Sequence, residues 1–139
     1  MRTDIMSEEK RRYTMSKIRS KNTKPELRIK EVLDRMGVSY KYQAKINGRR
    51  VDFLLPEHKI VIEYRSCFWH WCPKCYGDRI PVKGGILGRE WWKQKLKKNR
   101  ERDARLEKML RDMGYRLVVI WGHDKNRIEK ILEEMLRDV

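Results

Sequence analysis

The sequence is poor in cysteine, phenylalanine and proline, and it has no apolar run long enough to cross a membrane. Its 139 residues include three cysteines, two phenylalanines and four prolines. Three cysteines are too few for a disulfide framework, which excludes the small disulfide-rich secreted domains. The missing apolar run excludes an integral membrane protein, and no secretory signal opens the chain. We therefore expect a cytoplasmic protein.

Negative charge is also scarce. Lysine and arginine number 35 against 20 aspartates and glutamates, which gives a formal net charge of +15. Thermophilic adaptation would add glutamate about as readily as lysine, so it does not explain the excess. The imbalance favours a polyanion as the partner. We expect a nucleic-acid-binding protein associated with the nucleoid.

Length and patterning indicate one domain behind a basic segment. A chain of 139 residues is large enough to build a single core. Residues 1–22 form a basic N-terminal arm, which is either a flexible segment or a short helix lying on phosphate. Residues 23–139 form the single domain.

Within the domain, helix and strand patterns follow one another. Thr23-Lys24-Pro25-Glu26 predicts a helix start, in which Glu26 closes a capping box. Alternating and β-branched runs predict strands over residues 39–44, 50–55, 59–64 and 115–121. Helical periodicity predicts helices over residues 90–113 and 126–139, with a loop over 77–89. This αβββαβα order predicts an α/β sandwich with a mixed four-stranded sheet flanked by helices.

All three cysteines fall within nine residues, Cys67-Phe68-Trp69-His70-Trp71-Cys72-Pro73-Lys74-Cys75. Thiolates at this C-x4-C-x2-C spacing supply three corners of a zinc tetrahedron. The aromatic side chains between them would then be held rigidly at the end of a strand. A zinc ion with a fourth protein ligand has no open position, so it would be structural rather than catalytic.

Two carboxylates fall on neighbouring predicted strands. Side chains alternate across a strand, so Asp52 should face away from Val51 and Phe53. On the next strand, Glu63 and Arg65 share a face. The pattern Asp-x10-Glu-x-Arg resembles that of the PD-(D/E)XK nucleases, with arginine where lysine is usual. Carboxylates placed in this way hold Mg²⁺ against a scissile phosphate, where the ion activates water and stabilises developing charge.

Three blocks of the sequence resemble the Vsr-type very-short-patch-repair endonucleases, which are T·G mismatch endonucleases of the PD-(D/E)XK superfamily. The blocks are Asn47-Gly48-Arg49-Arg50-Val51-Asp52-Phe53, the Cys67-Phe68-Trp69-His70 segment with its cysteines, and Glu90-Trp91-Trp92 through Asn99-x-x-Arg102-Asp103. The resemblance implies a restriction-endonuclease-like fold and a DNA-repair hydrolase that acts on double-stranded DNA. It further implies Mg²⁺-dependent nicking on the 5′ side of the thymine in a T·G mismatch by a monomer.

The resemblance also implies roles for individual residues. Asp52 would bind magnesium together with a main-chain carbonyl near Tyr64. Glu63 is added as a magnesium ligand by the PD-(D/E)XK pattern, since the Vsr-type family commonly has an apolar residue at that position. His70 would be a catalytic acid or base, and Glu26 a supporting active-site carboxylate. A histidine just after the last strand would complete a Cys₃His zinc site with Cys67, Cys72 and Cys75. In this chain that residue is His123, and His70 is the rival fourth ligand.

Aromatic side chains of the family enter the base stack beside the mismatch. By resemblance these are Phe68 and Trp69, with Trp92 from the following helix. Inserting such a wedge costs a few kcal/mol of stacking, and least at a mispair. Core packing is the other interpretation, and we prefer it for Trp71, Trp91 and Trp121.

Two polar residues interrupt the apolar stripe of the helix predicted over residues 90–113. Asn99 and Asp103 either form hydrogen bonds inside the protein or mark the part of the helix that faces the active-site cleft. Because lysines and arginines surround them, we expect this helix to follow the phosphate backbone. Lys95 and Asn99 are the DNA contacts predicted here.

The segment Tyr64-Arg65-Ser66 departs from the family pattern, which has a short polar or acidic residue and then glycine before the first zinc cysteine. One hypothesis is that Glu63 and Arg65 restore a full nuclease triad and are both catalytic. Another is that Arg65 displaces the metal, so that the protein is a zinc-stabilised DNA-binding protein without nuclease activity. A restriction-type or general nuclease without mismatch specificity is the third alternative.

Overall fold

The structure, a computed structural model, describes residues 22–137. Its elements are α2 (Lys24–Arg35), β1 (Lys41–Ile46), β2 (Arg49–Leu55), β3 (Ile60–Arg65), α3 (Arg89–Asp112), β4 (Arg116–Trp121), the 3₁₀ helix η1 (Gly122–Arg127) and α4 (Ile128–Arg137). The predicted basic arm, residues 1–22, lies almost entirely outside the described residues. None of the helices within residues 22–137 is long and apolar enough to span a membrane. Apart from η1, the elements follow the predicted order.

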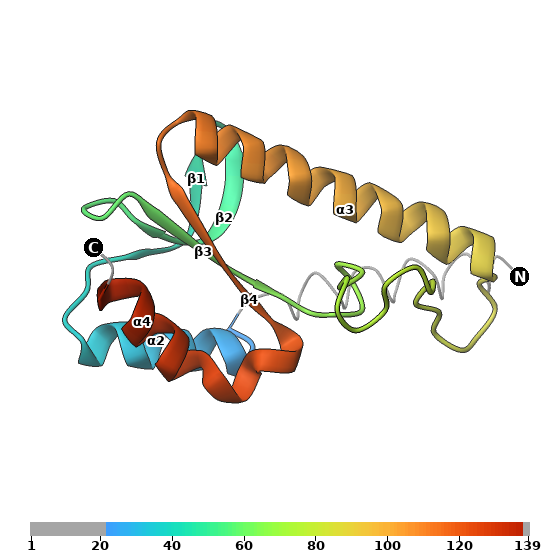
Figure 1. Cartoon of the computed structure of the whole chain (residues 1–139), viewed down its shortest axis with the longest axis horizontal. Helices are drawn as coiled ribbons and strands as arrows, with labels where there is room; N and C mark the ends of the chain where they lie inside the picture. Colours follow the sequence, from blue (N-terminus) through green and yellow to red (C-terminus); the bar gives the residue numbers. More distant parts are fainter. Residues whose placement is uncertain (1–21, 138–139) are drawn as a thin grey trace, which may run out of the picture.

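The four strands form one mixed sheet in the order β1-β2-β3-β4 (Figure 1). The β1–β2 and β2–β3 pairs are antiparallel, and the β3–β4 pair is parallel. The β1–β2 hairpin turns at Asn47 and Gly48, whose φ angles are 52° and 80°. Two positive φ angles suit a tight hairpin turn, and asparagine followed by glycine adopts them readily. Helix α3 supplies the long crossover that the parallel pair requires.

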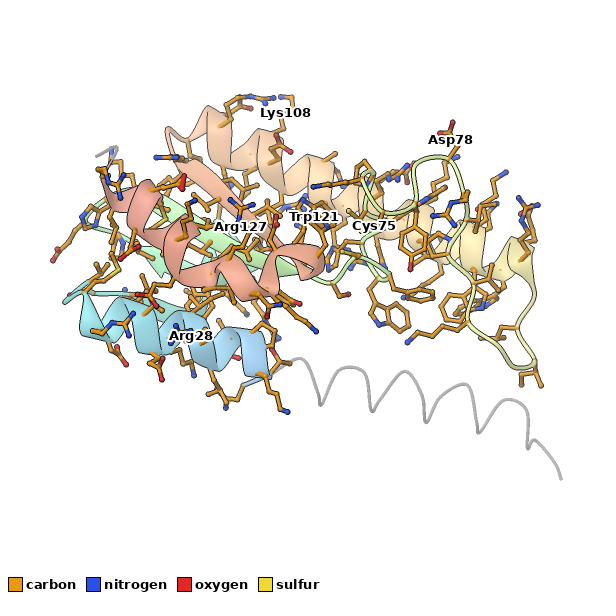
Figure 2. The ribbon with its side chains drawn as sticks, turned by 60° about the horizontal axis from the view of Figure 1, so that its bottom comes forward. Arg28, Cys75, Asp78, Lys108, Trp121 and Arg127 are labelled. Carbon is orange, nitrogen blue, oxygen red and sulfur yellow. The ribbon has the colours of Figure 1, made fainter. Side chains whose placement is uncertain are left out.

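Helices cover both faces of the sheet. In Figure 1, α3 runs along one face, and α2 and α4 lie on the other. The larger core fills the space between the sheet and the α2–α4 pair, with Ile29, Leu33, Phe53, Ile62 and Leu132 among its buried residues. Arg28 of α2, labelled in Figure 2, donates to Glu129 of α4 at 2.7 Å. This ion pair is partly exposed, so the buried apolar surface is what mainly holds the two helices together.

Helix α3 packs against two different surfaces. Its 24 residues span about 36 Å, and its N-terminal half extends beyond the sheet over the loop 66–88 (Figure 1). Leu106 and Leu110 in the C-terminal half pack on the sheet, whereas Trp92 and Leu96 pack on the loop. Between these apolar pairs lie Asn99 and Asp103. The polar interruption seen in the sequence is therefore the place where α3 passes from the sheet to the loop.

The predicted alternation along β2 is wrong at Val51. This residue packs with Leu54 and Val61 in the core beneath α3, whereas Phe53 belongs to the core formed by α2 and α4. The β2–β3 ladder reaches the pair Phe53–Ile62, and the next N–H, that of Asp52, donates to a side chain of β3 instead. Strict alternation does not hold across Asp52, because the regular ladder ends there.

Candidate active site

Four titratable side chains meet beneath the polar interruption of α3. Asp52 of β2, Glu63 of β3, His70 of the loop and Asp103 of α3 line a cavity of about 390 Å³. The same cavity is lined by Arg49, Arg50, Arg102 and Leu106. Carboxylates and arginines gathered around one opening can bind a divalent cation and a phosphodiester together. The structure thus brings Asp52 and Glu63, which the nuclease pattern pairs, together with His70.

Main-chain hydrogen bonds fix the carboxylates of Asp52 and Glu63. Asp52 Oδ2 accepts a bond of 2.8 Å from the Tyr64 N–H, and Glu63 Oε2 accepts one of 2.9 Å from the Asp52 N–H. Tyr64 itself packs against the α2–α4 core, while Glu63 and Arg65 lie on the α3 side. The prediction that Glu63 and Arg65 share a face, opposite Tyr64, is confirmed.

Burial favours the protonated forms of both carboxylates. Burial raises the pKa of Asp52 to about 6, against the opposing effect of the bond from the Tyr64 N–H. Burial, followed by the charge of Asp52, raises the pKa of Glu63 to about 8. A bound cation would favour the ionised form of both groups. Their oxygen donors are the kind that Mg²⁺ prefers, so this pair fits a magnesium site.

His70 is oriented from α3. Its Nδ1 lies 2.7 Å from Asp103 Oδ2, and both side chains are partly buried. A carboxylate on one ring nitrogen fixes the orientation of the imidazole and leaves Nε2 to exchange protons. In the sequence, Asp103 ends a block of the family resemblance and interrupts an apolar stripe, but no pattern pairs it with His70. The contact that gives it a role joins residues 33 positions apart.

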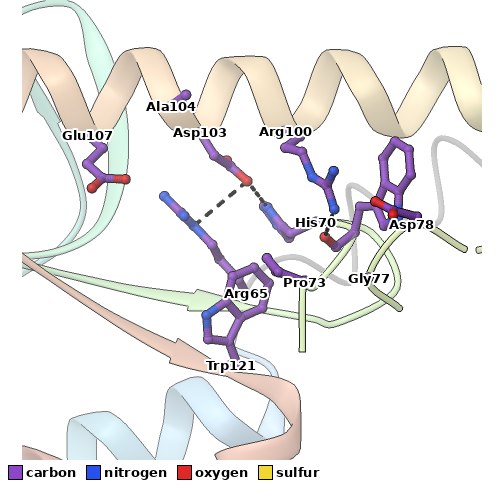
Figure 3. A pocket seen from close by; sticks show the side chains of 11 residues that line it. Arg65, His70, Pro73, Gly77, Asp78, Arg100, Asp103, Ala104, Glu107 and Trp121 are labelled. Atoms are coloured by element: carbon purple, nitrogen blue, oxygen red, sulfur yellow. Dashed lines mark hydrogen bonds and ion pairs between the residues drawn. The ribbon is translucent and has the colours of Figure 1, made fainter. Parts of the chain in front are cut away.

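Arg65 lies buried between two carboxylates. It is 5% exposed, and its Nε lies 3.9 Å from both Glu63 Oε1 and Asp103 Oδ2. Figure 3 shows the contact with Asp103. Its Nε and Nη2 have no hydrogen-bond partner among residues 22–137. A buried cation with so few hydrogen bonds is unfavourable unless nearby negative charge compensates it. Glu63 and Asp103 supply that charge, and Arg65 in turn favours the ionised form of Glu63.

Glu26 lies outside the cavity just described. Its Oε1 accepts hydrogen bonds from the Thr23 N–H at 3.1 Å and the Tyr42 hydroxyl at 3.0 Å, so the predicted capping box is formed. The residue is 4% exposed. Its charge nevertheless contributes to the raised pKa of Asp52. Glu26 is therefore both a helix cap and an electrostatic neighbour of the site.

The three cysteines converge on His123. Its Nδ1 lies 3.3 Å from Cys67 Sγ, 3.6 Å from Cys72 Sγ and 3.4 Å from Cys75 Sγ. The tetrahedral geometry of zinc places sulfur and nitrogen ligands about 3.5 Å apart. The four side chains could therefore hold a zinc ion, whereas His70 bonds to Asp103 instead. Figure 2 shows Cys75 in this loop, near the end of β4 at Trp121.

Close approach of two backbones makes this cluster possible. A Cβ atom on Gly122 would lie 3.3 Å from the Tyr64 hydroxyl and 3.4 Å from Cys67 Sγ. Glycine thus allows the end of β4 to pass tightly over the start of the loop. On the far side of the histidine ring, Nε2 lies 3.5 Å from Asp124 Oδ2. A metal-bound histidine commonly donates its other ring N–H to a carboxylate placed in this way, which fixes the orientation of the ring.

The predicted wedge residues pack against one another. Phe68, Trp69 and Trp92 form a cluster with ring centroids 5.2 to 5.6 Å apart. Lys83 Nζ lies over both loop rings, 4.8 Å from the Phe68 centroid and 4.7 Å from that of Trp69. Trp92 is 4% exposed. The expectation that Trp91 is a core residue is wrong, since it is 36% exposed and lies outside the apolar stripe of α3.

The predicted DNA contacts on α3 lie beside this cluster. Lys95 is partly buried, one turn after Trp92 on the same helix. Asn99 is 9% exposed, and its Nδ2 donates to the Trp69 carbonyl at 2.9 Å. No pattern in the sequence marked the arginines at the cavity individually. Arg49 and Arg50 belong to the hairpin block of the resemblance, and Arg102 to the block on α3.

The fold and the site together define a class of protein. The catalytic domain of the homing endonuclease I-Bth0305I matches this chain with a TM-score of 0.53 at 26% sequence identity. The match covers 81% of this chain and 90% of the homing endonuclease chain. The protein is a DNA endonuclease with a restriction-endonuclease-like fold.

Sequence comparison is more specific. The family model of the DNA mismatch endonuclease Vsr matches residues 3–76. The type II nicking enzyme V.XorIIP of Xanthomonas oryzae pv. oryzae is 34% identical, over 99% of this chain and 96% of the relative. The DNA mismatch endonuclease Vsr of Escherichia coli is 30% identical, over 97% and 83%. The chain belongs to the Vsr family, which confirms the resemblance found in the sequence.

Proposed function

We propose that this endonuclease nicks double-stranded DNA on the 5′ side of the thymine in a T·G mismatch, by magnesium-dependent hydrolysis of a phosphodiester. The observation that carries the proposal is the convergence of Asp52, Glu63 and the His70–Asp103 pair on one cavity lined by arginines. The mismatch specificity rests on the family and on the named activity of the Escherichia coli relative. The protein acts as a monomer, in the cytoplasm and on the nucleoid.

The metal site lies where β2 and β3 separate. Asp52 and Glu63 would hold the Mg²⁺, together with the main-chain carbonyl of Tyr64. When bound there, the ion would supply Lewis-acid chemistry, namely polarisation of the scissile phosphate and activation of a water molecule. Arg49, Arg50 and Arg102 line the same cavity and orient the phosphates around the scissile bond.

His70 is the catalytic acid or base. Asp103 holds its Nδ1, so Nε2 exchanges a proton with the reacting groups. Arg65 offsets the negative charge of Glu63 and Asp103, and its contacts with these two carboxylates keep them in place. Glu26 supports Asp52 electrostatically from the start of α2.

The zinc site would shape the loop, and the aromatic cluster on it binds the substrate. Cys67, Cys72, Cys75 and His123 would hold a structural zinc ion, which would fix the loop carrying His70. Phe68, Trp69 and Trp92 enter the base stack at the mispair. Lys95 and Asn99 contact the DNA from the same side of α3.

A comparative nicking assay tests the proposal. Duplexes with one T·G pair are compared with matched T·A duplexes in Mg²⁺, with randomised flanking base pairs so that no unknown sequence preference hides activity. The parent should cut the T·G strand 5′ of the thymine, and Asp52→Ala should not. Equal cutting of both duplexes would indicate a restriction-type or general nuclease. Binding without cutting, under any divalent metal, would indicate a DNA-binding protein.

A further inference from the structure

Helix α3 holds the loop at three successive residues around His70. Asn99 Nδ2 donates to the Trp69 carbonyl at 2.9 Å, and Asp103 Oδ2 lies 2.7 Å from His70 Nδ1. Between them, Arg100 Nη2 donates to the Trp71 carbonyl at 2.7 Å. The main chain is therefore held on both sides of His70 by side chains of α3.

Arg100 makes a second contact with the same residue. Its guanidinium carbon lies 4.0 Å from the centroid of the Trp71 ring, within the range of a cation–π interaction. The Trp71 indole N–H in turn donates to the Arg79 carbonyl at 2.8 Å, and the residue is 8% exposed. Arg100 thus holds both the ring and the carbonyl of the residue that follows His70.

The backbone at Trp71 needs such support. Its φ angle is 47°, in the left-handed region that bulky side chains rarely adopt. A strained conformation of this kind persists only where surrounding contacts over-determine it. The metal-binding cysteines Cys67 and Cys72 hold the two ends of this segment, whereas the ring of Trp71 itself contacts Arg100.

The loop also has space into which it can move. His70, Trp71, Arg100 and Asp103 line a second cavity of about 460 Å³, on the side toward Trp121 (Figure 3). His70 lines both cavities. If Trp71 relaxed, the imidazole could shift toward the second cavity and away from the carboxylates of Asp52 and Glu63.

We propose that Arg100 is a positioning residue for His70. By fixing Trp71 in its left-handed conformation, it keeps the imidazole on Asp103 and facing the metal site. The proposal rests on the proposed catalytic role of His70. It separates Arg100 from the other basic residues of α3, whose expected partner is DNA phosphate.

The test compares Arg100→Met and Arg100→Lys with the parent. Methionine keeps much of the apolar stem but can neither donate to the carbonyl nor act as a cation. The single-turnover nicking rate at saturating DNA should fall about 100-fold, because small misplacements of a reacting group have effects of this size. Lysine keeps one donor and the charge, so it should restore the rate to within about tenfold of the parent. Lys108→Met, which removes an exposed cation paired with Asp112 at the far end of α3, should leave the rate unchanged.

DNA affinity distinguishes positioning from phosphate contact. The dissociation constant of Arg100→Met, measured across salt concentrations, should keep the parent's salt slope. A slope lower by about one unit, with an unchanged rate at saturation, would make Arg100 a phosphate ligand and overturn the proposal.

Hydrogen exchange, which does not depend on nicking, tests the role of Arg100 independently of the proposed function. The amides of His70, Trp71 and Cys72 donate within the loop, to Ser66, Phe68 and Cys67. Their hydrogen exchange should rise at least tenfold in Arg100→Met while the zinc content of the protein is unchanged. If the parent does not nick DNA, the proposed function fails, but this exchange result still tests the clamp. Unchanged exchange would overturn the clamp, whatever the activity of the parent.

Discussion

The Glu63 carboxylate accepts a hydrogen bond of 2.9 Å from the main-chain N–H of Asp52. Asp52 in turn accepts one of 2.8 Å from the Tyr64 N–H, so two side chains take the place of ladder bonds where β2 and β3 part. The strands are thereby held open, and two carboxylates face each other in a buried site. Such a pair is stable only when protonated or when a cation lies between its members.

Glu63→Gln separates the charge of this residue from its hydrogen bond. Glutamine still offers an oxygen to the Asp52 N–H, but it removes one of the two like charges. Nicking should fall at least about 100-fold, because one anionic metal ligand is lost. At about pH 8 and without magnesium, the free energy of unfolding should rise by about 1 kcal/mol or more, because glutamine is neutral in the buried site without binding a proton there, and each pKa unit between the folded and unfolded states corresponds to about that amount. Asp103 remains as the counter-charge of Arg65. Nicking assays and urea denaturation measure the two effects.

Glu63→Ala is the matched control, because it removes the charge and the hydrogen-bond acceptor together. The buried Asp52 N–H then has no partner on β3, which should lower the free energy of unfolding by about 1–3 kcal/mol. If the glutamine variant were destabilised as much as the alanine variant, the repulsion inferred for Asp52 and Glu63 would be wrong.

The raised pKa values also set a pH dependence. Burial raises the pKa of Glu63 from 4.5 to about 8, so between these values the folded protein keeps a proton that the unfolded chain releases. The magnesium-free, zinc-loaded protein should therefore lose stability as pH rises from about 6 to 8, by at most about 1.4 kcal/mol per pH unit for one proton. Thermal unfolding at several pH values measures the slope. Magnesium should reverse it, since the ion binds the deprotonated carboxylates.

In Glu63→Gln this slope should largely disappear. Burial raises the pKa of Asp52 only to about 6, so Asp52 titrates mostly below the range of about pH 6 to 8 in which the slope is measured. A slope as steep in the variant as in the parent would assign the pH dependence to groups elsewhere in the protein.

Local patterns in the sequence were enough to predict the strands and the two carboxylates. Alternation and β-branching depend on neighbouring residues, so β2, β3 and the placement of Asp52 and Glu63 follow from the chain itself. The pairing of His70 with Asp103 does not, because it depends on how α3 crosses the loop 66–88.

Two of the errors have identifiable physical reasons. Val51 departs from alternation because the ladder ends at Asp52, a tertiary effect that no local pattern shows. Trp91 and Trp92, in contrast, were separable in principle. Successive residues of a helix point about 100° apart, and only Trp92 continues the stripe to Leu96 and Asn99.

Zinc should be required for the stability of the loop that carries His70, and not only for nicking. Burial, followed by the hydrogen bond between its thiol and that of Cys75, raises the pKa of Cys67 to about 11 when no metal is bound. Zinc binds the thiolates, so its binding should release protons and be weaker at low pH. His123→Ala should lower the zinc content below one equivalent and lower the melting temperature. Metal analysis, and proton release on adding zinc to the metal-free protein, check this.

Asp124→Asn offers a milder variant at the same site. It keeps the four ligands but weakens the partner of His123 Nε2, which lies 3.5 Å away. Loss of a carboxylate that contacts a metal ligand typically weakens metal affinity by about 10- to 100-fold. Full zinc occupancy and unchanged zinc affinity in both variants would show that His123 and its neighbours do not form the zinc site.

Trp69 should carry a large part of the preference for a mispair. Stacking of a base on an aromatic ring contributes about 1–3 kcal/mol, so Trp69→Ala should weaken binding to T·G DNA by about 5- to 150-fold. Binding to matched DNA should change less, because the wedge enters a stable stack less readily. Trp69→Phe keeps a ring and should retain most of the preference. Fluorescence anisotropy with both duplexes measures the ratio.

Lys83 and Trp91 provide the controls for this prediction. Lys83 lies over the rings of Phe68 and Trp69, so it has to leave that face before a base can stack there. Lys83→Met removes the cation that holds this face, and it should leave the preference for T·G in place. Trp91→Ala removes the exposed ring next to Trp92 on α3, and it should also leave the preference for T·G unchanged. A preference that survives in Trp69→Ala but is lost in Trp91→Ala would move the wedge from the loop to the outer face of α3.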